Sequence, residues 1–167
     1  MLERFNLGGH FPIAPVATMS LATLRSSVID ARREGGHTEY AIKVQLSIDD
    51  ESIVIYRRYS AFVQLQKFVL RHLKEGNCCS GGKCLLESFL KSLFETEFPN
   101  ANFLSKNSKS VVQDRVYFLN DFLMRMQETM AKCPPRIIQR CETEGCKVSK
   151  LLKSFLGAVA VNPAHYE

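Results

Sequence analysis

Between residues 40 and 48, apolar side chains alternate with polar or small ones, and this pattern constrains the fold more than any other feature of the chain. The apolar positions are Tyr40, Ile42, Val44, Leu46 and Ile48. A period of two over this length is typical of a β-strand with one buried face. Such a face needs a second layer to cover it, so the chain must combine a sheet with further structure.

Two more strands are expected on either side of this one. Residues 19–29 read as a first strand that ends in a polar turn over residues 30–36. Asp49 and Asp50 form the next turn, and residues 52–56 form a third strand. Because strands joined by short turns run in opposite directions, we expect an antiparallel sheet of three strands.

After Tyr59 the apolar period changes to that of a helix. A helical stripe runs through Phe62, Leu65, Val69 and Leu73 and stops at Gly76. Further helices are predicted over residues 85–95, 111–130 and 146–157, with breaks at Pro99 and at Pro134-Pro135. Strands followed by helices predict an α+β fold, a three-stranded antiparallel sheet packed on a helical layer. We expect one domain over residues 18–157, with tails at 1–17 and 158–167.

Composition is that of an ordinary globular protein, with 46% apolar and 23% charged residues among 167. The net charge of +5 mildly favours an anionic partner. The sequence has no run of about 18 apolar residues, the length a membrane-spanning helix needs. From its two ends we expect neither a signal peptide nor a site for myristoylation or prenylation. We therefore expect a cytoplasmic protein whose folded surface makes any membrane contact.

The six cysteines and four histidines give no sign of a catalytic centre. Cys78 and Cys79 are adjacent, Cys84 follows after four residues, and no C-x2-C pair is present. These spacings favour free thiols over zinc, so no metal and no cofactor are expected, and a zinc-dependent protein is the less favoured alternative. No histidine has a suitably spaced nucleophile and acid, which argues against an enzyme. The basic residues are scattered, which argues against nucleic-acid binding.

An anion site is indicated where the third strand meets the first helix. Arg57, Arg58, Tyr59 and Ser60 stand at this junction. Arginine can bind phosphate oxygens in pairs, and a tyrosine ring can lie against a sugar-like ring. Arg115 falls on the apolar stripe of a later helix, where a guanidinium needs an anion. The alternatives are an arginine pair on the surface and, for Arg115, an internal carboxylate from Asp30, Asp114 or Glu97.

The order of these elements and two sequence blocks resemble the phox-homology (PX) domain. The blocks are Ile-Tyr-Arg-Arg-Tyr-Ser-Ala-Phe over residues 55–62 and Asp-Arg-Val-Tyr-Phe-Leu-Asn-Asp-Phe-Leu over residues 114–123. The resemblance implies binding of phosphatidylinositol 3-phosphate and recruitment to endosomal membranes during trafficking. It also implies that Arg58 holds the 3-phosphate, that Tyr59 packs under the inositol ring, and that Arg115 binds the 4- and 5-hydroxyls.

One part of the family pattern is missing, the lysine that holds the 1-phosphate in the loop after Pro99. Either Lys91 or Lys106 takes its place, or the site is weaker than in similar domains. The apolar residues Phe98, Phe103 and Leu104 either enter the bilayer or pack on the helices. The missing lysine also supports an alternative, in which the chain is a PX-like module that has weak or lost lipid binding and interacts with proteins in trafficking.

Overall fold

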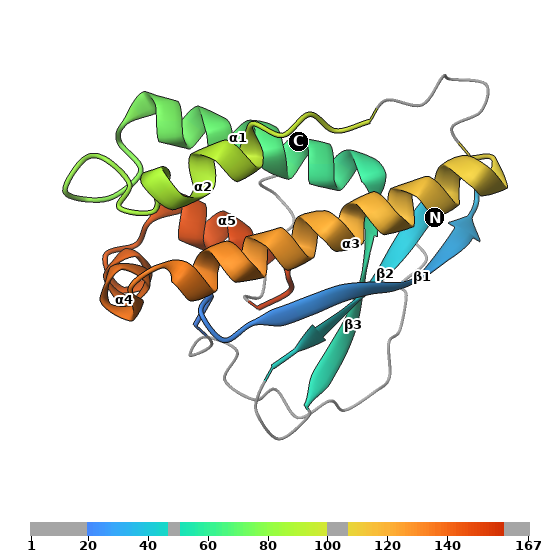
Figure 1. The fold of residues 1–167 in the computed structure, drawn as a ribbon, viewed down its shortest axis with the longest axis horizontal. Coiled ribbons are helices and arrows are strands. Elements are labelled where there is room, and N and C mark those ends of the chain that lie inside the picture. Colours follow the sequence, from blue (N-terminus) through green and yellow to red (C-terminus); the bar gives the residue numbers. More distant parts are fainter. Residues whose placement is uncertain (1–19, 47–50, 100–106, 159–167) are drawn as a thin grey trace, which may run out of the picture.

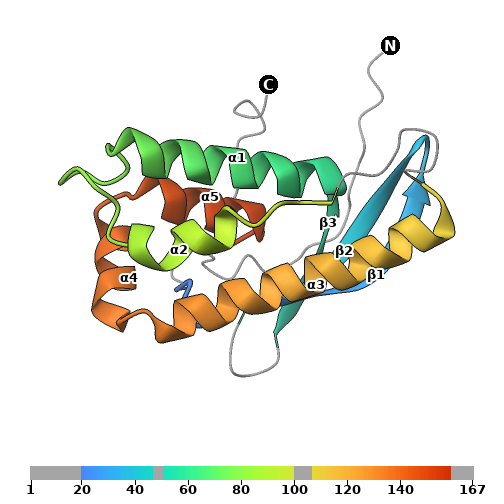
Figure 2. The ribbon, with the colours of Figure 1, turned by 45° about the horizontal axis from the view of Figure 1, so that its top comes forward.

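The computed structural model describes residues 20–46, 51–99 and 107–158, and within them a three-stranded sheet and five helices. The sheet lies at one end of the molecule, and the helices form a layer that extends beyond it (Figure 1). A second view shows α1 and α3 on opposite sides of the shorter helices α2 and α5 (Figure 2). This arrangement confirms the α+β fold expected from the sequence.

The sheet is an antiparallel meander of β1 (Arg25–Glu34), β2 (His37–Gln45) and β3 (Ser52–Arg58). The apolar alternation in β2 has the predicted effect, because Tyr40, Ile42 and Val44 are completely buried. The first strand begins and ends later than predicted. Its polar second half continues to pair with β2 as far as the two-residue turn at Gly35-Gly36. Most side chains in this half of the strand are exposed, so its sequence carries no alternation of apolar residues from which the strand could be predicted.

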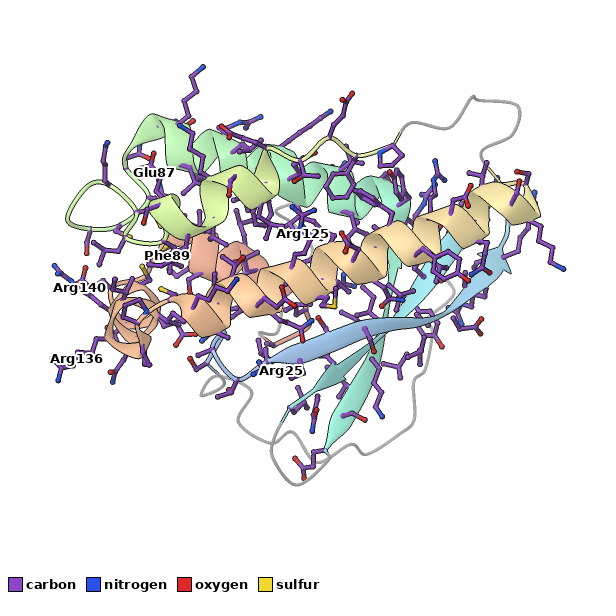
Figure 3. The ribbon with its side chains drawn as sticks, viewed as in Figure 1. Arg25, Glu87, Phe89, Arg125, Arg136 and Arg140 are labelled. Carbon is purple, nitrogen blue, oxygen red and sulfur yellow. The ribbon has the colours of Figure 1, made fainter. Side chains whose placement is uncertain are left out.

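Five helices follow the sheet, and their bounds are α1 (Tyr59–Glu75), α2 (Glu87–Phe94), α3 (Lys109–Lys132), α4 (Pro135–Thr143) and α5 (Lys147–Phe155). The prediction that Pro134-Pro135 only breaks the chain was incomplete, because a helix starts there. Pro135 occupies the first turn of α4, where a proline costs no intrahelical hydrogen bond. The side chains of Arg136 and Arg140 project outward from this helix (Figure 3).

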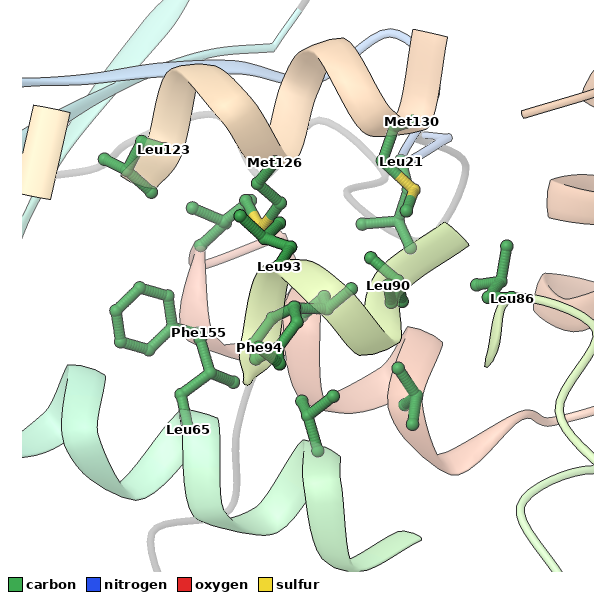
Figure 4. Close-up of a cluster of buried hydrophobic side chains, with 14 of the residues drawn as sticks. Leu21, Leu65, Leu86, Leu90, Leu93, Phe94, Leu123, Met126, Met130 and Phe155 are labelled. Carbon is green, nitrogen blue, oxygen red and sulfur yellow. The ribbon is translucent and has the colours of Figure 1, made fainter. Parts of the chain in front are cut away.

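The core lies between the helices and under the buried face of the sheet. The predicted stripe of α1 is correct, since Phe62, Leu65, Val69 and Leu73 are all buried. Figure 4 shows how leucine, methionine and phenylalanine side chains from α1, α2, α3 and α5 meet in one cluster. The packed helices therefore hold the start of α1 and the middle of α3 in fixed positions.

Two side-chain amides of α3 bond to the edge of β1 where a fourth strand could otherwise pair. Asn120 accepts a hydrogen bond from the Val28 amide (2.7 Å) and donates one to the Val28 carbonyl (3.0 Å). Gln127 makes the same pair of bonds with Ser26, at 3.2 and 2.8 Å. These four bonds fix α3 along the strand and satisfy the backbone groups beside a bulge in β1.

Candidate functional site

The two arginines at the end of β3 have different surroundings. Arg57 donates to the carbonyl oxygens of Phe155 (3.0 Å) and Ser154 (3.4 Å), the last residues of α5. At the carboxyl end of a helix, where the last carbonyl groups lack their usual partners and the helix dipole is negative, a guanidinium is favourably placed. Arg57 is therefore a structural residue that joins β3 to α5.

Arg58 is exposed and occupies the N-cap of α1 with extended backbone. Its side chain makes no capping hydrogen bond, and the first turn of α1 contains no acidic residue. The positive end of this 17-residue helix is thus not neutralised by carboxylates in its own first turn. The guanidinium and the helix end together favour an anion beside Arg58.

The structure brings Arg115 of α3 to Tyr59 at the start of α1. The centre of the guanidinium lies 3.9 Å from the centroid of the tyrosine ring, which is a cation–π contact. The buried Tyr40 hydroxyl lies nearby; burial raises the pKa of Tyr40, and Arg115 acts in the opposite direction. Asp30, Asp114 and Glu97, the carboxylates considered for Arg115, are exposed.

Tyr59 is held from more than one side. Its hydroxyl donates a hydrogen bond of 2.5 Å to the carbonyl oxygen of Pro99, and Phe98 lies edge-on at 6.1 Å between centroids. Burial raises the pKa of Tyr59, an effect that the charge of Arg115 opposes. We define Arg58, Tyr59 and Arg115 as the basic cluster. It joins α1, α3 and the segment that leads to Pro99.

The suggestion that Phe98 contacts a membrane is wrong, because the structure buries this side chain to 5% exposure. Phe98 packs on Phe118 and Phe122, with ring centroids at 5.0 and 5.1 Å. Edge-to-face aromatic contacts of this kind stabilise the core. Phe103 and Leu104 lie outside the described residues, so the suggestion remains a prediction for them.

Of the two lysines considered for the 1-phosphate, Lys106 lies outside the described residues. Lys91 is exposed on α2 and lines a shallow groove with Cys84, Glu87, Ser88, Ser92 and Glu95. The structure therefore gives Lys91 two acidic neighbours and does not place it in the basic cluster. A role for Lys91 in binding a phosphate is not favoured by these neighbours.

The structure also gathers cysteines that the sequence spacings did not connect. Cys78, Cys79 and Cys84 come from the loop after α1, and Cys146 precedes α5. All four are buried, and their sulfur atoms lie within 4.8 Å of one another. A hydrogen bond from Cys84 lowers the pKa of the Cys146 thiol to about 5. The sequence spacings did not reveal this group because its fourth member, Cys146, lies 62 residues after Cys84.

Comparison with solved structures identifies the class of fold. The chain is similar to an X-ray structure of a designed CISK-PX domain, with a TM-score of 0.51 and 22% sequence identity over 79% of this chain and 97% of the other. The similarity establishes that the chain has the fold of a PX domain. No protein-family model and no curated protein matches the sequence. Within the described residues, no helix combines the length and the apolar character needed to cross a bilayer.

Proposed function

We propose that this PX-like domain binds the headgroup of phosphatidylinositol 3-phosphate and thereby recruits the protein to endosomal membranes. The observation that carries the proposal is the stacking of Arg115 on Tyr59 (3.9 Å) beside the exposed Arg58. Two guanidinium groups and an aromatic ring from separate elements suit a phosphorylated ring better than they suit a simple anion.

Each member of the basic cluster has a distinct part in this proposal. Arg58 holds the 3-phosphate through paired hydrogen bonds, helped by the positive end of α1. Tyr59 packs against the inositol ring, with its orientation fixed by the hydrogen bond to Pro99. Arg115 is half-buried and stacked on Tyr59, so its guanidinium is already oriented before it binds the ring hydroxyls.

The 1-phosphate is the weak point of the site. The usual loop lysine is missing after Pro99, and Lys91 has Glu87 and Glu95 as neighbours. One exposed ion pair contributes only about 0.2–1 kcal/mol. The absence of the lysine that binds the 1-phosphate therefore lowers the affinity for the headgroup by only a small factor. Recognition of the 3-phosphate still depends on Arg58.

Sedimentation with liposomes that each contain one phosphorylated phosphatidylinositol tests the proposal. We expect preference for the 3-phosphate, and we expect Arg58→Ala to weaken it roughly tenfold to a hundredfold, since a charge-assisted hydrogen bond contributes about 1.5–3 kcal/mol. Arg136→Ala is the matched control, because it removes the same charge from the exposed surface of α4, at the other end of the molecule (Figure 3). Equal effects of the two changes would contradict a specific site.

The alternative, a PX-like module that binds proteins in trafficking, predicts a different result in the same experiment. A folded wild-type protein that sediments with none of the liposomes would support it. Arg58 is the N-cap residue of α1, and its exposed side chain makes no capping hydrogen bond. This position favours the lipid, because a cation at the positive end of a helix does not stabilise the fold and is useful only if an anion binds beside it.

A further inference from the structure

Four buried cysteines converge at the end of the molecule opposite the basic cluster. The loop after α1 and the start of α5 meet beside α4, whereas α1 begins next to the sheet (Figure 2). Within the described residues, Cys78, Cys79, Cys84 and Cys146 form a group whose sulfur atoms all lie within 4.8 Å of one another. Buried cysteines are common as small apolar residues, but four sulfur atoms from two distant segments meeting at one point are not explained by packing alone.

The spacing of the sulfur atoms matches the requirement of a tetrahedral zinc ion. A Zn–S bond of about 2.3 Å places two sulfur atoms of a tetrahedron roughly 3.8 Å apart. The sulfur atom of Cys146 lies 3.4 Å from that of Cys78 and 3.7 Å from that of Cys84. Small rotations of these side chains would therefore place all four at bonding distance from one ion.

Backbone groups around the cluster favour thiolates. The amide of Ser149 donates to the sulfur of Cys146 (3.5 Å). The amides of Val148 and Leu86 act to lower the pKa values of Cys78 and Cys84, whereas burial and the hydrogen bond with Cys146 raise both pKa values overall. Cys146 also occupies the N-cap of α5, where the positive end of the helix stabilises a negative sulfur. Amide donors of this kind support the ligands of metal centres.

The loop that carries three of the cysteines is shaped by its own hydrogen bonds. Cys79 and Gly82 exchange two backbone bonds, at 2.9 and 3.2 Å, and the amide of Lys147 donates to the carbonyl of Cys78 (3.1 Å). The first pair closes a tight turn between Cys79 and Cys84, and the second contact joins the loop to the start of α5. The backbone thus brings both segments together without a disulfide, since all four cysteines are free thiols.

We propose that Cys78, Cys79, Cys84 and Cys146 bind one structural zinc ion. Thiolate sulfur suits zinc in a tetrahedral site, and four protein ligands leave no open position for catalysis. The thiols release their protons as the metal binds. The ion would fasten the loop after α1 to the junction between α4 and α5. This inference does not rest on the proposed lipid binding.

Metal analysis of the full chain, purified with reductant and dialysed against zinc and then against metal-free buffer, tests the site. We expect about one zinc per chain, and in a cobalt-substituted sample the charge-transfer and visible bands of tetrahedral thiolate coordination. Cys84→Ser and Cys146→Ser should lose the metal. Cys133→Ser is the matched control, because Cys133 is equally buried but lies outside the group. Wild-type protein without zinc, or a disulfide among the four cysteines instead of metal, would overturn the proposal.

Cys141 tests the assignment of the ligands, since its sulfur lies 4.0 Å from that of Cys79. We expect Cys141→Ser to keep the full zinc content, and loss of zinc in this variant would overturn the proposed set of four.

If the serine variants fail to fold, thermal unfolding of the wild-type chain with and without zinc still tests the proposal. When free zinc exceeds its dissociation constant a thousandfold, binding should raise the thermal midpoint by about 10 °C over the stripped protein. Magnesium, which prefers oxygen ligands, should not restore the midpoint. An unchanged midpoint after stripping and reloading would contradict a structural role. Arg58→Ala should keep its zinc, so failure of the lipid site and failure of the metal site can be distinguished.

Discussion

Arg115 is the residue at which stability and binding can be separated most clearly. Its guanidinium lies on the face of Tyr59, within a helix whose fully buried side chains are all apolar. A cation–π contact at a partly exposed position contributes about 0.5–2 kcal/mol. If Arg115 serves mainly to bind the headgroup, its replacement affects binding far more than folding.

We predict that Arg115→Lys keeps the fold but loses about tenfold or more in liposome binding, because an ammonium cannot present paired donors to ring hydroxyls. The thermal midpoint should fall by no more than a few degrees. Arg125→Lys is the control on the same helix, where an exposed arginine pairs with Asp121 at 3.5 Å. A large fall in the midpoint with unchanged binding would make Arg115 a structural residue.

At the scale of elements, the long helix α3 and strand β1 are joined by side-chain amides. Asn120 and Gln127 each satisfy one amide and one carbonyl of the strand. A sheet edge with unpaired backbone groups can pair with another chain, and these amides prevent it. We therefore infer that α3 protects the β1 edge of the sheet from pairing with another strand.

We predict that Asn120→Ala lowers the free energy of unfolding by about 1–3 kcal/mol, because a backbone donor and acceptor at Val28 lose their partners. The midpoint of urea unfolding measures the change. Gln113→Ala is the control, since it removes an exposed amide from the same helix. Equal midpoints for the two variants would contradict the importance of these bonds.

The sequence predicted those elements whose apolar period decides their burial. The stripe of α1 and the inward face of β2 are examples, and both are correct. Two features could not be read in this way. The polar half of β1 forms through pairing with β2, and α4 begins at prolines that also mark chain breaks. At the candidate site, the pattern proposed Arg58, Tyr59 and Arg115, and their part in binding stays a prediction. The role of Arg57 could not be proposed from the pattern, because it depends on contacts with α5. The contact between Cys146 and the loop after α1 could not be predicted, because it depends on the packing of segments far apart in the sequence.

At the scale of the whole molecule, a net charge of +5 mildly favours any anionic surface. This long-range attraction differs from the short contacts proposed for Arg58 and Arg115. Salt separates the two effects, because screening is strong for exposed charges and weak for partly buried pairs.

We predict that binding to liposomes of plain anionic lipid is weak and disappears as salt rises from about 0.1 M toward 1 M, where the Debye length is about 3 Å. Binding to liposomes with phosphatidylinositol 3-phosphate should persist over part of this range. Arg58→Ala and Arg136→Ala should weaken the plain anionic binding equally. Parallel salt dependence for both kinds of liposome would indicate attraction by net charge alone.

The different positions of Arg57 and Arg58 have a consequence for how such chains diverge. Arg57 is bonded to the end of α5, so any descendant that keeps the fold is under pressure to keep this residue. Arg58 faces solvent, and under the proposed function it is the ligand that maintains this residue. A lineage that abandons headgroup recognition is therefore expected to drift first at the second arginine and to retain the first. In a comparison of distant sequences, the first arginine alone marks shared architecture, and only the second carries information about what the domain binds.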